Sequence, residues 1–300
     1  MGDIKLFRVS SEKIAELEGK AADLEKSLQT QFERNLDALL GVRFLASEFQ
    51  TSNGGRMDTL GIDENGCPVI IEYKRDRNEN VINQGLFYLD WLMDHRGDFE
   101  VLVRDRLGIP VAETIEWSAP RLICIAGDFT RYDEHAVKQM SRNIELIRYK
   151  KFGEDLLLLD QITAVSATNQ RVTSTAGVSQ QTYKTVSEYL LDANEALSNL
   201  YADTRIFLLS LGDDVQESAL RFYFAFKRIK NFACVEVKPQ LGVVRLYLKV
   251  NPDEIDCSDG FCRDVRNVGH FGTGDLELTL KNHDDLERAK PLILRSYEAS

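Results

Sequence analysis

The stretch from Arg56 to Lys74 reads R-M-D-T-L-G-I-D-E-N-G-C-P-V-I-I-E-Y-K. Residues 63–66, D-E-N-G, form a turn sequence between two apolar runs, which predicts a β-hairpin. Successive side chains of a strand point to opposite faces, so in a strand over 68–74 Glu72 and Lys74 share one face. A carboxylate and an ammonium side by side at the end of an apolar strand indicate a functional site.

Asp58 lies on the first strand of this hairpin, with thirteen residues between it and Glu72. On adjacent strands the two carboxylates would repel each other unless a cation lies between them. The donors are hard oxygens without a neighbouring histidine or cysteine, so Mg²⁺ or Mn²⁺ is the expected ion. Such an ion lowers the pKa of a bound water, and Lys74 positions that water or stabilises developing negative charge. For Glu72 and Lys74 alone, the simpler alternative is a solvated ion pair.

Apolar periodicity in the first half of the chain predicts a helix, three strands, a second helix and then further strands. Apolar residues recur at three- and four-residue steps over 11–40, which indicates the first helix. The other expected elements are strands over 42–49, 56–62, 68–74, 99–103, 121–126, 144–149 and 156–159, a helix over 80–94 capped by Asn80, and a helix near 132–141. We therefore expect an α/β (α+β) fold with a mixed central sheet.

The composition changes over 161–183, where Thr, Ser, Ala, Gln and Val dominate and Arg171 is the only charged residue. This stretch predicts a flexible linker. We expect a first domain over 1–160 and a smaller C-terminal α/β domain over 184–300. The expected C-terminal elements are a helix over 184–200, strands near 219–227, 232–238, 243–249 and 275–280, and a helix over 284–298 that Pro291 kinks or splits.

The composition of the whole chain limits the classes of function. No stretch reaches the roughly 18 uninterrupted apolar residues of a membrane span, and the first residues lack the pattern of a secretory signal. We therefore expect a cytoplasmic protein without a membrane partner. The formal net charge of −11 argues against a protein that coats nucleic acid nonspecifically. It does not exclude a nuclease, because a metal site is itself acidic and only a local basic surface is needed for phosphate contacts.

The cysteines indicate reduced thiols rather than a disulfide framework or a zinc site. Their number, five, is odd, and no two of them form a C-x-x-C pair. Cys257, Cys262 and His270 match the spacing of no standard zinc finger. The five are Cys67, Cys124, Cys234, Cys257 and Cys262.

The motifs G-R-x-D at 55–58, E-x-K at 72–74 and Q-x3-Y at 84–88 resemble the NucS-type endonuclease branch of the PD-(D/E)XK nuclease superfamily. The likeness spans residues 20–105 and includes an E-x-x-L motif at 25–28. It implies a restriction-endonuclease-like (tRNA-endonuclease-like) core. The catalytic set that the resemblance implies is Glu25, Asp58, Glu72, Lys74, Gln84 and Tyr88. The metal ligands that it implies are Asp58, Glu72 and Glu25.

Some roles within this set have alternatives. Glu33 and Glu48 are rivals for the first acid, and the motif context favours Glu25. Gln84 and Tyr88 are four residues apart and so lie on one helical face. They could orient a water, contact a phosphate or stack on a base. A surface glutamine and a core tyrosine are the alternative.

The candidates for nucleic-acid contacts are Arg56, Lys227, Arg228 and Lys230. Arg56 either contacts a phosphate, supports the carboxylates or forms a structural salt bridge. The other three belong to a basic stretch over 221–249, whose simpler interpretation is a solvated strand and loop edge.

The C-terminal part of the chain, residues 190–300, resembles a separate, uncharacterised domain family. The motifs that carry this resemblance lie at 226–228 (F-K-R), 231–233 (N-F-A) and 269–275 (G-H-F-G-T-G-D). The last motif could form a backbone nest for phosphate, and a glycine-rich turn into a strand is the alternative. We expect this domain to bind nucleic acid or a partner protein and to present substrate to the first.

These observations predict a metal-dependent endonuclease that hydrolyses phosphodiester bonds of nucleic acid, with DNA as the expected substrate and repair, restriction or defence as the expected role. The resemblance also implies a homodimer, because cleavage of a duplex by this fold usually needs two active sites. The substrate-selecting domain of the NucS-type endonucleases has no visible counterpart in this sequence. The alternatives are a nucleic-acid-binding module with weak or lost catalysis and a protein-interaction module on a nuclease fold.

Overall fold

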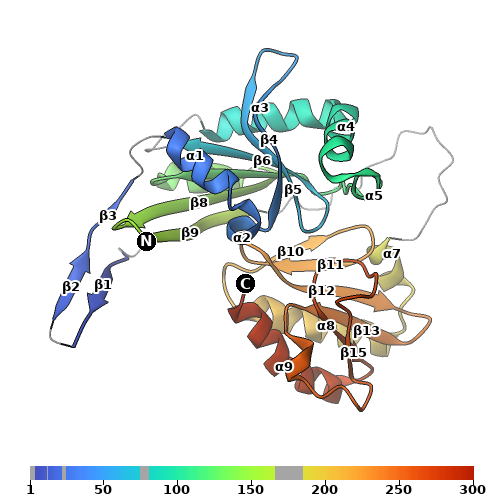
Figure 1. The fold of residues 1–300 in the computed structure, drawn as a ribbon. Helices are drawn as coiled ribbons and strands as arrows, with labels where there is room; N and C mark the ends of the chain where they lie inside the picture. Colours follow the sequence, from blue (N-terminus) through green and yellow to red (C-terminus); the bar gives the residue numbers. More distant parts are fainter. Residues whose placement is uncertain (1–3, 12, 22–24, 75–80, 166–184) are drawn as a thin grey trace. The chain divides into compact units, whose positions relative to one another are not determined.

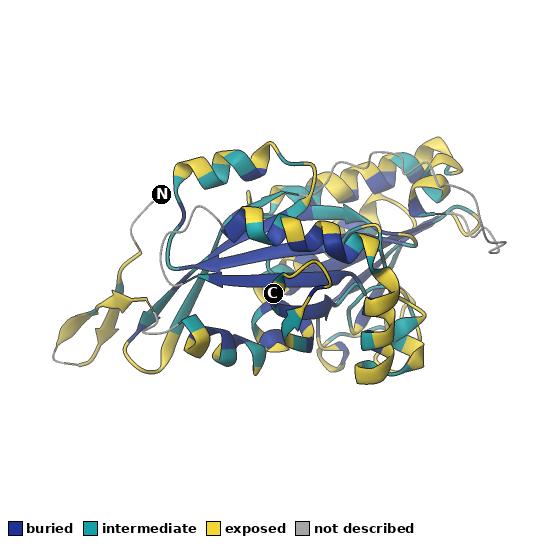
Figure 2. Ribbon diagram, turned by 90° about the horizontal axis from the view of Figure 1, so that it is seen from above, coloured by how far each residue is buried: buried dark blue, intermediate teal, exposed yellow. Residues whose placement is uncertain are grey.

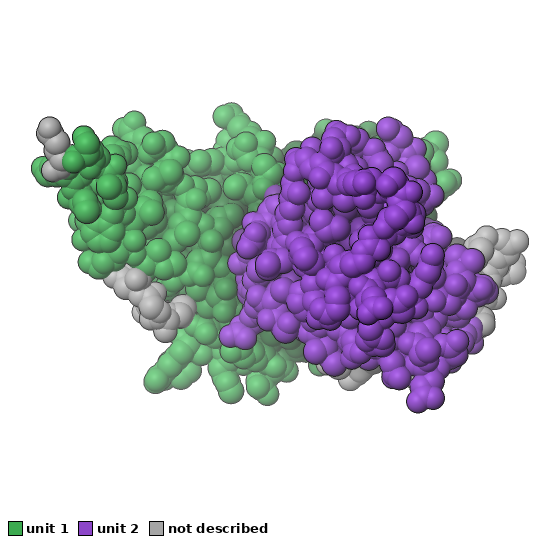
Figure 3. Space-filling view, turned by 90° about the horizontal axis from the view of Figure 1, so that it is seen from below, with its two compact units in different colours: residues 1–62, 68–115, 120–165 green, residues 63–67, 116–119, 166–300 purple. Residues whose placement is uncertain are grey.

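The computed structural model describes residues 4–11, 13–21, 25–74, 81–165 and 185–300 (Figure 1). By its internal contacts the chain divides into two compact units (Figure 3). The first unit comprises residues 1–62, 68–115 and 120–165, and the second unit comprises residues 63–67, 116–119 and 166–300. Both units combine helices with strands, so the fold class is mixed α/β, as the sequence predicted.

A seven-stranded sheet forms the centre of the first unit, in the order β3-β8-β7-β6-β5-β4, with β9 paired to β8. Its strands are β3 (Gly19–Lys20), β4 (Val42–Gln50), β5 (Arg56–Asp63), β6 (Pro68–Lys74), β7 (Arg121–Ala126), β8 (Asn143–Phe152) and β9 (Leu156–Val165). β7 runs parallel to both β6 and β8, whereas β5 is antiparallel to β6 and β9 is antiparallel to β8. The central sheet is therefore mixed, which confirms the prediction.

Helices pack against this sheet and bury its central strands (Figure 2). The helices of the first unit are α1 (Glu25–Glu33), α2 (Leu36–Leu40), α3 (Val81–Asp94), α4 (Arg96–Leu107), α5 (Ile109–Ala112), which packs on α4, and α6 (Arg131–Lys138). Helix α1 packs against β6, and α3 packs against β6 and β7. Gly85 permits the close approach of α3, because a Cβ at this position would lie 2.4 Å from Leu122 Cδ1. Every residue of β6 except Lys74 is buried, so Glu72 enters the interior.

Most predicted elements of the first unit are confirmed. The predicted strands over 68–74 and 121–126 coincide with β6 and β7. The strands predicted over 42–49, 56–62, 144–149 and 156–159 are longer by one or more residues as β4, β5, β8 and β9. The helices predicted over 80–94 and 132–141 are α3 and α6, while the proposed cap Asn80 lies outside the described residues.

The prediction of one helix over 11–40 is wrong in its first half. Strand β1 (Leu6–Val9) pairs antiparallel with β2 (Ile14–Leu17), and helix begins only at Glu25. Ile14 pairs with Val9 across this hairpin. Helical periodicity is counted along one segment and takes no account of pairing across a hairpin, so the spacing of the apolar residues was misleading.

The prediction of a strand over 99–103 is also wrong, because these residues lie within α4. The buried residues of α4 are Phe99 and Val103, which are four apart and therefore share one helical face. The start of the predicted linker needs correction as well. Strand β9 continues to Val165, so residues 161–165 are strand, and the remainder of the linker lies outside the described residues.

The second unit is built on a six-stranded sheet in the order β10-β11-β12-β13-β15-β14, with antiparallel neighbours throughout. Its strands are β10 (Gln216–Ala219), β11 (Phe224–Lys227), β12 (Asn231–Lys238), β13 (Val243–Leu248), β14 (Cys262–Asp264) and β15 (Leu276–Leu280). The strand predicted over 219–227 is thus two strands, β10 and β11, and the prediction missed the short strand β14. The other three predicted strands are confirmed as β12, β13 and β15.

The helices of the second unit are α7 (Val186–Leu191), α8 (Glu195–Ser210), α9 (His283–Glu298) and the 3-10 helix η1 (Pro252–Glu254). The helix predicted over 184–200 is interrupted, because Asn194 caps a new helix by accepting a hydrogen bond from the Leu197 N–H. Pro291 does not split α9, which continues through it. In the described parts of both units, none of the helices has the length and apolar character needed to cross a membrane.

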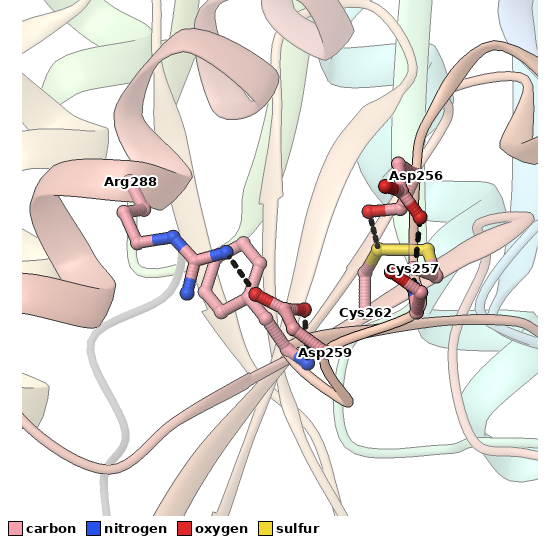
Figure 4. Close-up of a disulfide and its surroundings, with 7 residues drawn as sticks. Asp256, Cys257, Asp259, Cys262 and Arg288 are labelled. Atoms are coloured by element: carbon pink, nitrogen blue, oxygen red, sulfur yellow. Dashed lines mark hydrogen bonds and ion pairs between the residues drawn. A yellow bond between two sulfur atoms is a disulfide. The ribbon is translucent and has the colours of Figure 1, made fainter.

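A disulfide joins Cys257 to Cys262 in the second unit (Figure 4). The prediction that all cysteines are reduced is therefore wrong for this pair, and the two sulfurs are not zinc ligands. Nearby, Arg288 pairs with Asp259 at 2.5 Å, and its guanidinium lies 4.2 Å from the centroid of the Phe261 ring. The other three cysteines are buried and form no disulfide, as predicted: Cys67, Cys124 and Cys234.

Candidate active site

The register of β5 and β6 brings Asp58 and Glu72 together. Thr59 pairs with Ile71 in this antiparallel ladder, so the next position sets Asp58 opposite Glu72. At that position backbone N–H groups donate hydrogen bonds to the side-chain carboxylates. The Asp58 N–H donates to Glu72 Oε1 at 3.2 Å. The Tyr73 N–H donates to Asp58 Oδ2 at 3.0 Å. The two acids are therefore fixed by the main chain of the neighbouring strand.

Burial makes this pair of acids electrostatically unusual. Glu72 has no exposed surface, and this burial, together with the charge of Asp58, raises the pKa of the Glu72 carboxyl to about 9. Burial also raises the pKa of Asp58. Glu72 Oε2 is buried and has no hydrogen-bond partner among the described atoms. A buried acceptor of this kind is costly unless it is protonated or bound to a cation.

Lys74 lies beside the pair, at the point where β6 reaches the surface. Its side chain is 17% exposed, and its Nζ lies 3.3 Å from Glu25 Oε1 on the first residue of α1. Glu25 therefore forms an ion pair with Lys74, and its negative charge also contributes to the raised pKa of Asp58. Among the residues with described positions, no three His, Cys, Asp or Glu side chains are grouped so that they could hold one ion. Of the three acids that the sequence predicts as metal ligands, Asp58 and Glu72 are the two that backbone hydrogen bonds hold together.

The two rivals for the first acid are engaged by other protein groups. Glu33 Oε1 accepts hydrogen bonds from Thr59 Oγ1 at 2.7 Å and from Gln29 Nε2 at 2.9 Å. Glu48 pairs with Lys26 and with Arg56. Neither rival lies in a cluster of acids with Asp58 and Glu72 within the described chain.

Gln29 is a buried residue of the site that the sequence interpretation missed. The residue is 4% exposed, and its side-chain amide donates to the Asp58 carbonyl oxygen at 2.7 Å. The same Nε2 lies 3.2 Å from Ser47 Oγ on β4. Gln29 thereby connects α1 to β4 and β5. The signal was present in the sequence, since residues 25, 29 and 33 lie on one helical face.

Tyr88 and Gln84 support the turn before β5. Tyr88 is 6% exposed, and its hydroxyl accepts hydrogen bonds from the Arg56 N–H and from Gln84 Nε2, both at 3.2 Å. The ring packs so closely on the turn that a Cβ on Gly55 would lie 2.5 Å from it. This burial corresponds to the alternative of a core tyrosine and does not fit stacking of Tyr88 on a base.

The basic residues predicted to contact nucleic acid differ in exposure. Arg56 is 63% exposed and forms a salt bridge with Glu48. Lys227 is buried, so a direct phosphate contact by Lys227 does not fit the structure. Arg228 pairs with Asp214 at 2.7 Å and lies over the Tyr297 ring, and Lys230 is half-buried. Lys227, Arg228 and Lys230 therefore do not form an exposed basic surface on the second unit.

The glycine-rich stretch 269–275 is a packed turn in the second unit. The Thr273 N–H donates to Cys234 Sγ at 3.3 Å, and the Asp275 N–H donates to the Leu248 carbonyl oxygen at 3.0 Å. Gly274 has a φ of 142°, and a Cβ at this position would lie 2.6 Å from a backbone nitrogen. Because these N–H groups are satisfied within the protein, the turn alternative fits better than a phosphate nest.

An uncharacterized protein of Haemophilus influenzae is 30% identical to this chain over 305 residues, which cover 98% of the chain and 100% of that protein. The chain belongs to the same family as this protein. Residues 186–300 of this chain match the domain of unknown function DUF5655. This match coincides with the helices and strands of the second unit from α7 onward.

Solved structures with partial likeness are repair endonucleases and related proteins. A crystal structure of a repair endonuclease from Pyrococcus abyssi matches 45% of this chain and 51% of its own, with 17% identity and a TM-score of 0.30. A structure of an EndoMS complex with double-stranded DNA matches 47% of this chain and 49% of its own, with 18% identity and a TM-score of 0.29. The chain thus spans about half the length of these structures.

Proposed function

We propose that the first unit is a metal-dependent nuclease that hydrolyses phosphodiester bonds of nucleic acid, with DNA as its substrate and Mg²⁺ or Mn²⁺ as its cofactor. The observation that carries the proposal is the buried pair Asp58 and Glu72 with Lys74 beside it. Glu72 Oε2 has no partner among the described residues, and a divalent cation would supply one. The E-x-K motif lies on β6, and Arg56 and Asp58 of the G-R-x-D motif lie on the neighbouring strand β5.

The residues present fit a magnesium ion. Mg²⁺ commonly keeps several water ligands and binds through one or two carboxylates, so Asp58 and Glu72 are sufficient as protein ligands. When bound, such an ion lowers the pKa of a water and polarises a phosphoryl oxygen. The backbone N–H groups of Asp58 and Tyr73 orient the two carboxylates before substrate arrives.

Lys74 and Glu25 complete the proposed chemistry. The Lys74 ammonium lies at the edge of the pair, where it can stabilise the negative charge that develops on the phosphate during attack by water. Glu25 accepts a hydrogen bond from Lys74 and holds it in this position. In this proposal Glu25 positions the lysine, and its role as a metal ligand is secondary.

A nuclease assay with matched variants tests the proposal. Purified full-length protein is incubated with single- and double-stranded DNA and RNA in Mg²⁺, Mn²⁺ or EDTA. We expect metal-dependent cleavage that Glu72→Ala and Lys74→Ala abolish, while Lys138→Ala, which changes an exposed lysine at the end of α6, leaves it intact. Absence of cleavage on every substrate, or cleavage that survives both site variants, would rule the proposal out.

A nucleic-acid-binding module without catalysis is the second candidate. The salt bridge between Glu25 and Lys74 favours it, because the lysine is engaged and the third acid is not grouped with the pair within the described chain. Binding of labelled DNA in EDTA that is unchanged by Asp58→Ala, together with no turnover in Mn²⁺, would support this candidate. Metal-dependent turnover would eliminate it.

We further propose that the enzyme is cytoplasmic, as the composition of the chain predicts, and that it acts on a DNA duplex as a homodimer, as the resemblance implies. Light scattering with a catalytically inactive Glu72→Ala variant and a duplex tests the assembly. A complex of two chains on one duplex is the expected result, and a single 34.1 kDa chain on the duplex would contradict it.

A further inference from the structure

Glu48 on β4 is held in an unfavourable backbone conformation next to the proposed active site. Its φ is 54°, and it is the sole non-glycine residue with positive φ in the described part of the chain. Residues with a Cβ adopt this left-handed region at an energetic cost, and they remain there only where surrounding contacts impose it. The Glu48 side chain forms ion pairs with one cation on α1 and one on β5.

The two cations converge on the Glu48 carboxylate. Lys26 Nζ lies 2.7 Å from Glu48 Oε1, and Arg56 Nε lies 2.6 Å from Glu48 Oε2. Hydrogen bonding and charge from Lys26, followed by the charge of Arg56, hold the pKa of Glu48 below its usual value. Both cations are mostly exposed, 59% for Lys26 and 63% for Arg56, whereas Glu48 is 28% exposed. A lysine and an arginine that both point at one carboxylate are also arranged to bind a phosphate.

These cations adjoin the acids of the proposed active site. Arg56 is two residues before Asp58 on β5, so the two side chains share one face of the strand. Lys26 follows Glu25, which contacts Lys74.

A shallow depression of about 510 Å³ extends from Lys26 along the exposed side of α1. Its lining is cationic and polar and contains no acid: Lys26, Ser27, Thr30, Gln31, Arg34 and Asn35. The acids of α1 point elsewhere, since Glu25 contacts Lys74 and Glu33 contacts Thr59. A nucleic-acid strand held at Lys26 could therefore continue over hydroxyl, amide and guanidinium groups.

We propose that Lys26 and Arg56 bind a phosphodiester group of a nucleic-acid strand, and that the Glu48 carboxylate occupies this position until the strand displaces it. Glu48 is then a positioning residue that holds the two cations in place and weakens binding by competing for them. The inference rests on the proposed function of the first unit, because it concerns the substrate strand of that same site.

Binding measured without metal separates this inference from catalysis. Fluorescence anisotropy follows a short fluorescein-labelled single-stranded DNA, with full-length protein in EDTA and at several salt concentrations. We expect Glu48→Gln to tighten binding several-fold, because the neutral amide no longer competes with phosphate. We expect Lys26→Met and Arg56→Met each to weaken binding and to lower the slope of log K against log salt by about 0.7. Lys138→Met, on the exposed face of α6, is the control and should change neither quantity.

A purely structural role for the three residues gives a different result. In that case Glu48→Gln lowers the melting temperature without tightening binding, and Lys26→Met leaves the salt slope unchanged; either finding overturns the proposal. If Glu48→Gln fails to fold, Glu48→Gly replaces it, since glycine accepts a φ of 54° and also removes the charge. Inorganic phosphate added as a competitor should displace the oligonucleotide from the wild type less effectively than unlabelled DNA does, and the reverse order would contradict a strand-binding site. Tighter binding by Glu48→Gln in a protein that cleaves nothing would leave this site standing while the nuclease proposal fails.

Discussion

The backbone N–H of Asp58 donates a hydrogen bond to the carboxylate of Glu72 at 3.2 Å, so one acid of the site is anchored by the main chain of the other. The Tyr73 N–H makes the matching bond to Asp58 at 3.0 Å. These two bonds follow the last residue pair of the β5–β6 ladder and use backbone donors that would otherwise continue it. The geometry of the pair is thus set by the register of a hairpin, and a change at either residue alters the environment of the other.

The metal-free protein should lose stability as the pH rises. Glutamate has a pKa of 4.5 when unfolded, and burial raises the pKa of Glu72 to about 9 in the folded protein. Between these values the folded state binds more protons, so the stabilisation is complete below pH 4.5 and is lost as the pH rises to about 9. One such proton gives a slope of at most about 1.4 kcal/mol per pH unit. Urea unfolding in EDTA across this range measures it.

Glu72→Gln is the variant that isolates this effect. The amide does not titrate, so the decline of stability with pH should be much shallower than in the wild type. Glu113→Gln, which changes an exposed glutamate after α5, should keep the wild-type slope. A slope that is the same in the wild type and in the Glu72→Gln variant would show that another group controls it.

Divalent cations should bind more tightly as the pH rises and should displace a proton. The raised pKa of Glu72 means that this carboxyl is largely protonated near neutral pH, whereas a metal ligand must be ionised. Calorimetry with Mn²⁺ in buffers of different ionisation enthalpy should therefore report release of about one proton per ion. Asp58→Ala should remove binding. A binding enthalpy that is the same in every buffer would contradict the assignment of Glu72 as ligand.

The sequence was sufficient for the hairpin that carries the site, because its two strands are local and its turn has a distinctive composition. Asp58, Glu72 and Lys74 were predicted on β5 and β6 and lie there. The partner of Lys74 could not be predicted, since Glu25 reaches it from a helix 49 residues earlier. The spacing of residues along the sequence does not show whether an acidic side chain contacts a metal ion or a lysine.

The other incorrect predictions also concern contacts that the local sequence pattern does not show. For the β1–β2 hairpin, the three-residue spacing of Ile14 and Leu17 predicts a helix, whereas pairing with Val9 and Leu6 makes the segment a strand. The disulfide of Cys257 and Cys262 closes a short loop whose geometry depends on β14, a strand too short to predict. Strand β6 was predicted without error because its apolar run is buried on both faces.

Gly55→Ala should destabilise the first unit. A Cβ at this position would lie 2.5 Å from the Tyr88 ring and 2.8 Å from Thr51 Oγ1, so the tyrosine and the turn before β5 must shift. Crowding of this kind typically costs about 1–3 kcal/mol. Gly97→Ala in α4 is the matched control, because a Cβ there would meet nothing within 4 Å and alanine favours helix. Thermal unfolding compares the two, and equal melting temperatures would refute the packing role of Gly55.

Gln29→Leu should weaken both the fold and metal binding. The substitution keeps a buried side chain of similar size but removes the donor to the Asp58 carbonyl oxygen and to Glu33. Leaving buried acceptors unsatisfied costs about 1–3 kcal/mol, which urea unfolding would detect. Because the lost bond reaches the backbone of Asp58, Mn²⁺ affinity should fall as well, by several-fold. Gln31→Leu, on the exposed side of the same helix, should change neither quantity. If Gln29→Leu lowers stability but leaves Mn²⁺ affinity intact, Gln29 holds the helix in place without contributing to the position of Asp58.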